Sequence, residues 1–237
     1  NPVDAFLNAR LGEAGLKPNG TAAARSLIRR AAVILTGLPP KAERVVRFEV
    51  DFKKAPDAAY GILVEELLAS PHFGERWAQH WLDVIRWAES NGSEANLYRK
   101  NAWLYRDYVV RAFNDDKPYD IFIHEQLAGD ELAPAPNRPQ NQAEIDQLIA
   151  TGYLRLGPHD TTRSIFGEDR KGHDQLMADL VNTTGEAFLG LTLSCANCHD
   201  HKYDPISQVD HFRMRAFFAA VKFRDNMVID TARVLDN

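Results

Sequence analysis

The sequence predicts an all-α fold, a single multi-helix domain of about nine or ten helices. Apolar residues recur at spacings of three and four along most of the chain, which is the period of an amphipathic helix. Glycine and proline clusters end these stretches. Of the 237 residues, 45% are apolar and 26% are charged, so the chain has the composition of a globular protein with a core. We expect one domain over 1–237, with a subdivision at a proline-rich loop, 132–140, as the alternative.

The first part of the chain is expected to hold four helices. Asn1 is a good N-cap and Pro2 suits the first helical position, and the apolar stripe that follows ends near Gly15. Thr21 is the expected N-cap of the second helix. Apolar stripes predict the other three helices over 21–35, 41–48 and 57–68.

An aromatic helix is expected over 72–89. Its rings, among them Trp77 and Trp81, follow one face, and both core packing and the wall of a ligand pocket explain them. Ser207 and Asp210 form a capping-box pattern that opens the last helix. The remaining helices are predicted over 103–113, 119–127, 145–156 and 173–189.

Charge and hydropathy exclude two classes of partner. The net charge is −5, and acids and bases are interspersed along the whole chain, so the basic stripe of a nucleic-acid-binding protein is missing. The longest apolar run, 31–35, is far shorter than the roughly 20 residues needed to cross a bilayer. We therefore expect no nucleic acid and no membrane span.

The two cysteines of the chain carry the strongest chemical pattern. They stand in Cys195-Ala196-Asn197-Cys198-His199. C-x-x-C-H is the attachment pattern of c-type haem, in which both thiols bind the porphyrin covalently and the histidine is the proximal ligand of the iron. The spacing suits this chemistry because residues three apart lie on one face of a helical turn. Cys195, Cys198 and His199 are thus predicted to hold one haem c.

Three other interpretations of the motif stay open. A thioredoxin-like dithiol requires the motif to follow a strand, and 189–193 alone is compatible with one. A structural zinc site usually needs a second cysteine pair, for which His199, His201 and an acid would have to substitute. A chance match is the third, because the motif is short.

A covalent haem predicts export, because it is attached to reduced thiols after the chain has crossed a membrane. We therefore expect a periplasmic or otherwise exported protein. The N-terminal residues 1–4 have neither the basic nor the apolar segment of a signal peptide. The expectation is that this peptide was removed or lies upstream, and that the chain is part of a longer protein.

Several segments together resemble a known family. They are LIRR (27–30), LTGLPP (35–40), ERWAQHWLD (75–83), WLYRDY (103–108), EQLAGD (125–130), FLGLT (188–192) and CANCHDHKYDPI (195–206). In these segments the chain resembles the planctomycete cytochrome c domain family, also called PSCyt2 or DUF1549. The resemblance implies a haem c near the C-terminus, export, and a longer protein with further domains. His124 and His159 depart from the usual pattern, so neither is assigned an inherited role.

The second axial ligand of the iron would decide the function, since two protein ligands favour electron transfer and an open position favours catalysis. His80 is the preferred distal ligand because it borders the aromatic stripe, although a core histidine bonded to Asp83 explains it equally well. Met177 is the less favoured choice, with core packing as the alternative. The other histidines and methionines considered are His72, His124, His159, His173, His201, His211, Met214 and Met227.

Further residues are candidates for the haem pocket or for support of the ligands: His201, Asp204, Trp77, Trp81 and Arg86. His201 is too close to His199 to reach the opposite face of the same ring, but it suits a propionate, a carboxylate or a neighbour's haem. Arg76, Arg86 and Arg106 either anchor propionates or pair with Asp83, Glu89 and Asp107.

A tight turn is the simplest interpretation of Asp200 and Asp204, with a Ca²⁺ site as the alternative.

The favoured function is electron transfer by a mono-haem cytochrome domain, whose partner is a redox protein or an adjacent cytochrome domain. No catalytic triad, P-loop or second metal motif stands in the sequence. The alternatives are an oxidoreductase with an open iron, of peroxidase-like or substrate-oxidising type, and a structural or assembly domain stabilised by haem.

Overall fold

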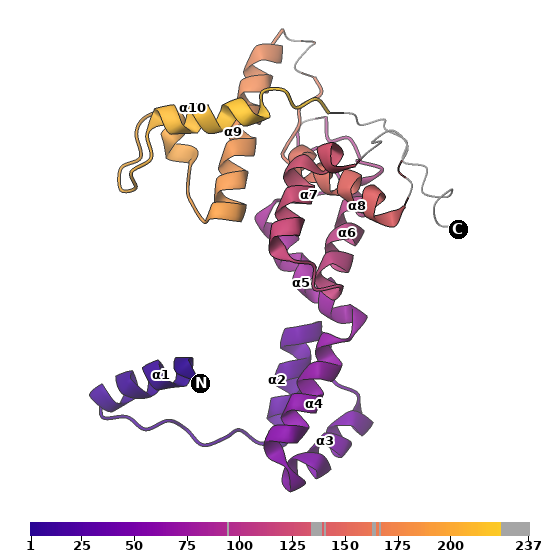
Figure 1. Cartoon of the computed structure of the whole chain (residues 1–237), viewed down its shortest axis with the longest axis vertical. Coiled ribbons are helices and arrows are strands. Elements are labelled where there is room, and N and C mark those ends of the chain that lie inside the picture. Colours follow the sequence, from indigo (N-terminus) through magenta and orange to yellow (C-terminus); the bar gives the residue numbers. More distant parts are fainter. Residues whose placement is uncertain (94, 134–138, 140, 163–164, 166, 224–237) are drawn as a thin grey trace. The chain divides into compact units, whose positions relative to one another are not determined.

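The computed structural model describes residues 1–93, 95–133, 139, 141–162, 165 and 167–223, and Figure 1 shows its helices. These residues form helices and connecting segments, and they contain no β-strand apart from one isolated bridge between Ser90 and Tyr98. The prediction of an all-α fold is therefore confirmed. No helix among the described residues is both long enough and apolar enough to cross a membrane.

Backbone contacts divide the chain into two compact units, Asn1–Ser70 and Pro71–Asn237. The division thus falls at Pro71, where a new helix begins. The alternative subdivision at 132–140 lies mostly outside the described residues. A single domain over 1–237 stays a prediction.

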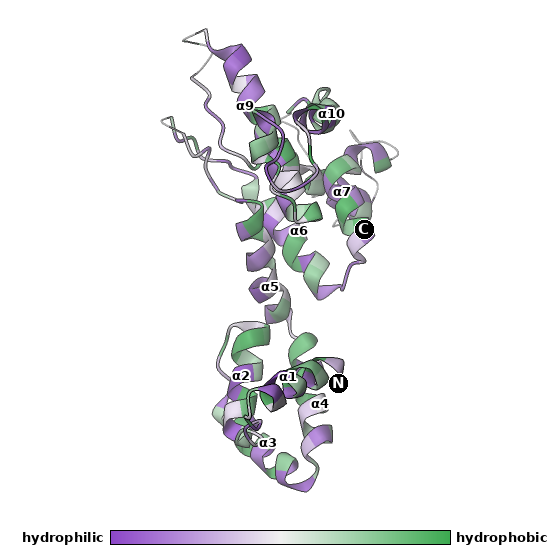
Figure 2. Cartoon of the chain, turned by 90° about the vertical axis from the view of Figure 1, so that its left-hand side faces the viewer, coloured by the Kyte–Doolittle hydropathy of each residue, from purple (hydrophilic) through white to green (hydrophobic). Residues whose placement is uncertain are grey.

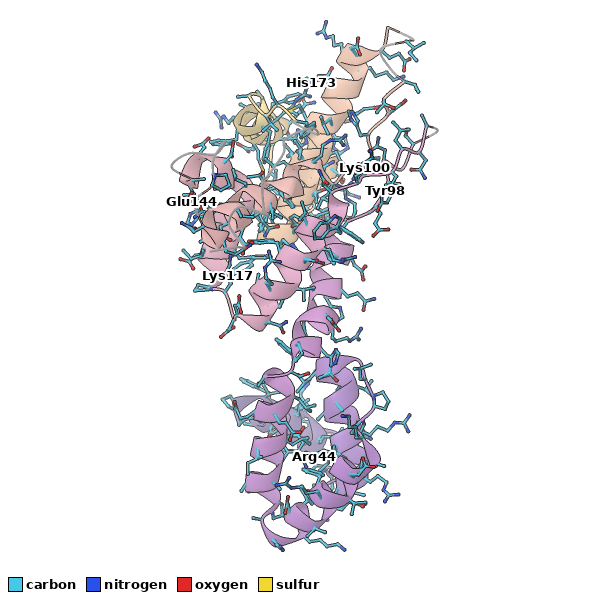
Figure 3. All side chains as sticks on the ribbon, turned by 90° about the vertical axis from the view of Figure 1, so that its right-hand side faces the viewer. Arg44, Tyr98, Lys100, Lys117, Glu144 and His173 are labelled. Carbon is cyan, nitrogen blue, oxygen red and sulfur yellow. The ribbon has the colours of Figure 1, made fainter. Side chains whose placement is uncertain are left out.

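The unit Asn1–Ser70 has a small core of its own. Its helices are α1 (Pro2–Glu13), α2 (Ala24–Thr36), α3 (Ala42–Lys54) and α4 (Pro56–Leu68). Ile28, Phe48 and Leu63 are fully buried where α2, α3 and α4 meet. Helices α2 and α3 each carry both hydrophobic and hydrophilic residues, and buried residues of both belong to this core, as an amphipathic pattern requires (Figure 2). Arg44 of α3 pairs with Glu66 of α4 at 2.7 Å beside this core (Figure 3).

The predicted helix starts in this unit are right in one case and wrong in another. The Asn1 side chain accepts a hydrogen bond from the backbone N–H of Asp4 at 3.0 Å, which confirms the N-cap of α1. Thr21 does not cap α2. The carbonyl of Ala23 accepts the first helical hydrogen bonds, so the helix begins at Ala24. The helix expected over 41–48 continues to Lys54.

The unit Pro71–Asn237 holds the larger core. Its elements are α5 (Pro71–Val84), α6 (Ala102–Asn114), α7 (Tyr119–Leu132), α8 (Gln142–Ala150), the 3₁₀-helix η1 (Thr151–Arg155), α9 (Asp169–Thr184), the π-helix η3 (Gly185–Leu189), the 3₁₀-helix η4 (Ser194–Asn197) and α10 (Gln208–Phe218). Close contacts join α5 to α6 and α7 to α8. Ile85, Val109, Ile145 and Val181 are fully buried in this core.

Several buried polar groups in this core are hydrogen-bonded or ion-paired. The Tyr108 hydroxyl donates to the Glu125 carboxylate at 2.8 Å, and Lys117 forms an ion pair with the same carboxylate (Figure 3). Burial and the Glu125 charge raise the pKa of Tyr108 well above its ordinary value. The indole N–H of Trp81 donates to the Tyr105 hydroxyl at 3.1 Å. These bonds fix α5, α6 and α7 to one another in a single arrangement.

Two helix ends in this unit differ from the predicted ones. The aromatic helix ends at Val84 rather than at residue 89, because Arg86 takes the left-handed conformation, with φ 59°. The helix expected over 173–189 already begins at Asp169, four residues earlier. It then widens into the π-turn η3 from Gly185 onward.

Gly74 is required where α5 meets α6. A Cβ built at this position would lie 2.4 Å from the backbone oxygen of Val110, which cannot easily move. We expect Gly74→Ala to destabilise the protein by about 1–3 kcal/mol through overpacking. Urea unfolding followed by circular dichroism measures this free energy.

Gly61 offers a matched control inside α4, because a Cβ there meets no atom within 4 Å. Gly61→Ala should stabilise the protein by up to about 1 kcal/mol, since alanine is the better helix former. Equal stability of the Gly74→Ala variant and the natural protein would contradict the close approach of the two helices.

Candidate functional site

The cysteine motif lies in the segment that connects η3 to α10. Gly190 takes the left-handed conformation, with φ 64°, and reverses the chain after η3. A Cβ at Gly185 would lie 2.5 Å from the side chain of Leu193, so a larger residue here would have to displace that side chain. Leu193 and Ala196 are both buried. These two side chains hold η4 against the unit.

The two cysteine side chains are exposed on one turn. Cys195 lies in η4, and the backbone N–H of Cys198 donates to the Cys195 carbonyl at 3.2 Å. Residues three apart eclipse each other in a 3₁₀ turn, so both thiols face the same side. They are free thiols and not a disulfide. The segment before them, 190–193, is irregular, and the strand of a thioredoxin-like motif is not formed there.

His199 is held in the orientation that a metal ligand needs. Its side chain is exposed, and Nδ1 lies 2.8 Å from the carbonyl oxygen of Asp200. Since a carbonyl only accepts, Nδ1 donates the hydrogen bond and the lone pair is on Nε2. Ligating histidines usually have such a second bond, because it fixes the tautomer and the ring orientation. The donor set of two exposed thiols and one oriented imidazole therefore fits covalent haem.

His201 closes the loop that follows the motif. Its Nδ1 accepts a hydrogen bond from the backbone N–H of Asp204 at 2.9 Å, and its own backbone N–H donates to the Ile206 carbonyl at 2.8 Å. Nδ1 also lies 3.2 Å from the Asp204 carboxylate. The side chain is 9% exposed. His201 thus stabilises the turn next to the iron ligand.

The two aspartates considered for Ca²⁺ have protein partners. The Asp200 carboxylate accepts from the backbone N–H of Gln208 at 2.8 Å, and Asp204 lies beside His201. Among the described residues, no three His, Cys, Asp or Glu side chains form a group that could hold a metal ion. The Ca²⁺ site stays a prediction.

Helix α10 is tied directly to the motif. Gln208 donates from its side chain to the Asn197 carbonyl at 3.2 Å, in addition to its backbone bond to Asp200. The predicted capping box is confirmed, because Ser207 and Asp210 exchange both of its hydrogen bonds. The first turn of α10 is therefore fixed against η4.

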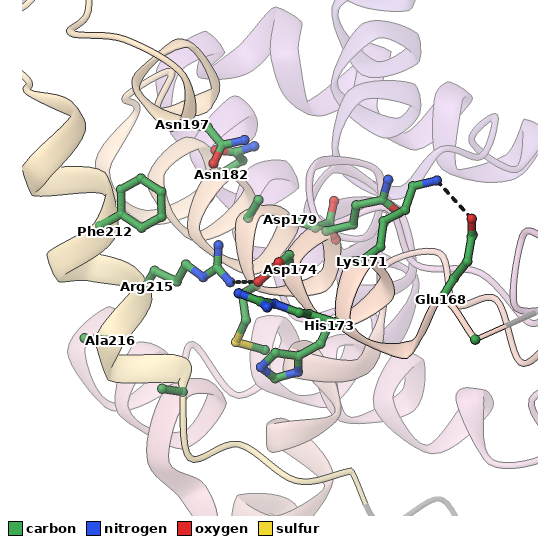
Figure 4. A pocket seen from close by; sticks show the side chains of 16 residues that line it. Glu168, Lys171, His173, Asp174, Asp179, Asn182, Asn197, Phe212, Arg215 and Ala216 are labelled. Atoms are coloured by element: carbon green, nitrogen blue, oxygen red, sulfur yellow. Dashed lines mark hydrogen bonds and ion pairs between the residues drawn. The ribbon is translucent and has the colours of Figure 1, made fainter. Parts of the chain in front are cut away.

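A hollow of about 1100 Å³ lies beside the motif, between α9 and α10 (Figure 4). Asn197 of the motif, Met177 of α9 and Phe212 of α10 contribute to its wall. Its charges are largely paired, with Arg215 on Asp174 and Lys171 on Glu168 at 3.4 Å. The hollow can therefore take a molecule with both apolar and polar groups.

The preferred distal ligand, His80, is not the core histidine that its place in the sequence suggests. It is exposed on α5, and its ring packs edge-on against Trp77 at 5.5 Å between centroids. Met177 is 1% exposed and belongs to the core, as the packing alternative predicts. Met227 lies outside the described residues. A role of His80 or Met177 at the iron stays a prediction.

The two tryptophan candidates are both partly buried. Trp81 packs against Phe188 of η3 at 5.3 Å and against Phe122 at 5.1 Å, so it links the core to the segment that leads into the motif. Trp77 is partly buried, and its indole N–H has no hydrogen-bond partner among the described residues.

Two of the three arginine candidates pair with protein carboxylates, whereas Arg76 donates to the Gln79 side-chain oxygen at 3.0 Å and not to Asp83. Arg86 forms a bidentate ion pair with Asp179 of α9, with N···O distances of 2.6 and 2.9 Å. The partners considered from the sequence were instead Asp83 and Glu89. This pair raises the pKa of Arg86. Arg106 pairs with Asp107 at 2.8 Å, as expected. A haem propionate would have to compete with these pairs.

Sequence reasoning gave His211 no special weight. The structure places it on α10, next to the motif, with 1% of its surface exposed. Its burial follows from a face shared with Met214 and Phe218, three and seven residues further on. That spacing is visible in the sequence, but the helix face that is covered depends on the packing of α10.

Comparison with known proteins identifies the family. A family model described as PSCyt2, protein of unknown function (DUF1549), matches residues 2–223. The chain belongs to this family. No curated protein and no solved structure matches it. The resemblance noted in the sequence is therefore confirmed for PSCyt2, and the family description gives no activity.

The cap of α10 gives a testable prediction for this PSCyt2 chain. Ser207→Ala removes the hydroxyl that caps the helix and should cost about 1 kcal/mol. The loss should appear as faster hydrogen exchange of the α10 amides. Ser194→Ala, an exposed serine that caps no α-helix, is the control and should leave this exchange unchanged.

The same cap predicts a pH dependence. Hydrogen bonds from Ser207 lower the pKa of Asp210, so the stabilisation is complete above the ordinary carboxyl pKa and disappears as the pH falls through the lowered one. Asp210→Asn should remove this acid dependence of α10 protection. An unchanged dependence in that variant would assign it to another group.

Proposed function

We propose that this chain is a mono-haem c-type cytochrome domain that transfers electrons within an exported protein. The observation that carries the proposal is the Nδ1 hydrogen bond of His199 to the Asp200 carbonyl, next to two exposed thiols on one turn. That bond leaves Nε2 as the only nitrogen of the ring that can bind iron.

Each residue of the motif has a defined task. The Cys195 and Cys198 thiols would hold the haem through thioether bonds, each sulfur bonding to a vinyl carbon while the thiol hydrogen goes to the neighbouring carbon. His199 would bind the iron through Nε2. When bound, haem supplies an iron that takes up and releases one electron. His201 and the capped α10 keep the motif turn in place on both sides.

The exposure of the motif suits exchange with a partner. Cys195, Cys198 and His199 are all exposed, and large apolar side chains nearby in the sequence, including Leu189, Tyr203 and Val209, are exposed as well. Porphyrin is a large apolar ring, so it would cover such surface. Its edge would then lie close to the protein surface, within reach of a redox partner or an adjacent cytochrome domain.

A haem oxidoreductase is the second candidate function. The hollow of about 1100 Å³ favours it, because Asn197 of the motif contributes to the wall and the space accommodates a small substrate. This candidate requires an open iron position, whereas electron transfer is favoured by two protein ligands.

Spectroscopy of the full chain, matured in a periplasm with haem-attachment machinery, tests the proposal. We expect one covalent haem that resists acid extraction, a low-spin spectrum in both oxidation states, and no spectral change when CO is added to the reduced protein. Cys195→Ala with Cys198→Ala should abolish covalent haem. Ser194→Ala, on the same turn, should retain it.

Two results would overturn parts of this proposal. A chain that carries no covalent haem is not a c-type cytochrome domain, and bound zinc or a titratable dithiol would then identify the alternative. Covalent haem with rapid CO binding would instead favour the oxidoreductase.

A further inference from the structure

The hollow between α9 and α10 is lined by small side chains on both helices. Ala178 of α9 and Ala216 of α10 both contribute to its wall, and Ala219 follows at the end of α10. Longer side chains at these positions would fill part of the space. With a volume of about 1100 Å³, the hollow is large enough for an organic molecule of several rings.

One end of this hollow combines an aromatic ring with two amide groups (Figure 4). Phe212 of α10 is 46% exposed, and Asn182 of α9 and Asn197 of the motif line the same end. The side-chain oxygen of Asn182 has no hydrogen-bond partner among the described residues. A bound molecule with an N–H group would supply this partner, and a flat ring would pack on Phe212.

The other end of the hollow holds an arginine that is available for an anion. Arg170, the second residue of α9, is exposed and has no carboxylate partner among the described residues. The carboxylates of the wall are each paired with a cation already, in the pairs Glu168 with Lys171, Asp174 with Arg215, and Asp179 with Arg86. The Arg170 guanidinium therefore remains for a ligand that carries a negative charge.

The separation of the two ends selects an extended ligand. Arg170 and Asn182 lie twelve residues apart on α9, which corresponds to about 18 Å along a helix. A small inorganic anion or a single ring would reach only one end. A three-ring heterocycle with a phosphorylated side chain would reach both.

We propose that the hollow binds a flat aromatic molecule with an anionic group, of the class of the flavin nucleotides. The ring system of a flavin carries an N–H between two carbonyl groups, which matches the donors and acceptors of the Asn182 and Asn197 amides. Its flat face packs on Phe212, and its phosphate pairs with Arg170.

The position of the hollow relates this ligand to the haem motif. Asn197 directly precedes Cys198, and the Cα atoms of adjacent residues are about 3.8 Å apart. A flavin is a redox carrier, so a molecule bound beside Asn197 would be a small-molecule redox partner of the haem. This role rests on the proposed function, whereas binding in the hollow does not.

Isothermal titration calorimetry of the full chain with flavin mononucleotide tests the site. We expect one molecule to bind per chain. Riboflavin lacks the phosphate, so it should bind about tenfold more weakly, the effect of losing one charged hydrogen bond. Inorganic phosphate alone should not displace flavin mononucleotide at equal concentration, because it reaches only Arg170.

Three variants locate the binding. Arg170→Gln should weaken flavin mononucleotide about tenfold and leave riboflavin unchanged. Ala216→Trp fills the hollow and should weaken both ligands by about tenfold or more. Arg213→Gln is the control, since it removes the same charge from an exposed arginine of α10 outside the hollow, and it should bind both ligands as the natural chain does. Because Arg170 is exposed, its variant keeps the test decisive if Ala216→Trp does not fold.

The outcomes separate this inference from the proposed function. No binding of flavin mononucleotide at millimolar concentration, or undiminished binding by folded Ala216→Trp, would overturn the site. Equal affinity of the natural chain for flavin mononucleotide and riboflavin would overturn the role of Arg170. Covalent haem without flavin binding leaves the proposed function intact, and flavin binding to a chain without haem leaves the site intact and removes its role as a partner of haem.

Discussion

The candidate site depends on the burial of Leu193 and Ala196. The buried side chains of Leu193 and Ala196 hold the turn η4 against the core of the unit Pro71–Asn237. The side chains that lie between and directly after these two residues therefore point away from the core. Cys195 and Cys198 are exposed for this reason. The arrangement needs Gly185 behind it, because any side chain there would occupy the space of Leu193. Packing, and not the chemistry of the thiols, thus decides that both sulfurs are available on one side of one turn.

The segments on both sides of that turn are rigid for different reasons. On the N-terminal side, Trp81 packs against Phe188 and donates to Tyr105, so the chain enters the motif from a fixed aromatic core. On the C-terminal side, hydrogen bonds predominate, with His201 closing a loop and the capping box starting α10. A ligand held at such a turn is bound by a preorganised scaffold, which lowers the cost of ordering it.

Much of the site was predictable because it is local in sequence. The attachment residues, the turn that joins them and the capping box all involve residues three or four apart, so a helical period suffices to expect them. The pairing of Arg86 with Asp179 was not predictable, since it joins residues far apart in the chain and depends on a left-handed Arg86 that ends α5 early. The aromatic helix likewise suggested a buried His80, either at the iron or in the core, but the face of α5 that carries it is exposed.

The sequence by itself determined the all-α class, the family and the residues of the C-x-x-C-H motif. These follow from the period of the apolar residues and from short spacings between motif residues, which are visible without knowledge of the fold. Only the tertiary structure decided which histidine is buried without a partner, where the hollow beside Asn197 lies, and which carboxylate pairs with Arg86. These features arise from the side of each helix that its neighbours cover. An amphipathic pattern shows that a helix has a buried face, but the packing of α9, α10 and η4 selects the polar residue enclosed within it.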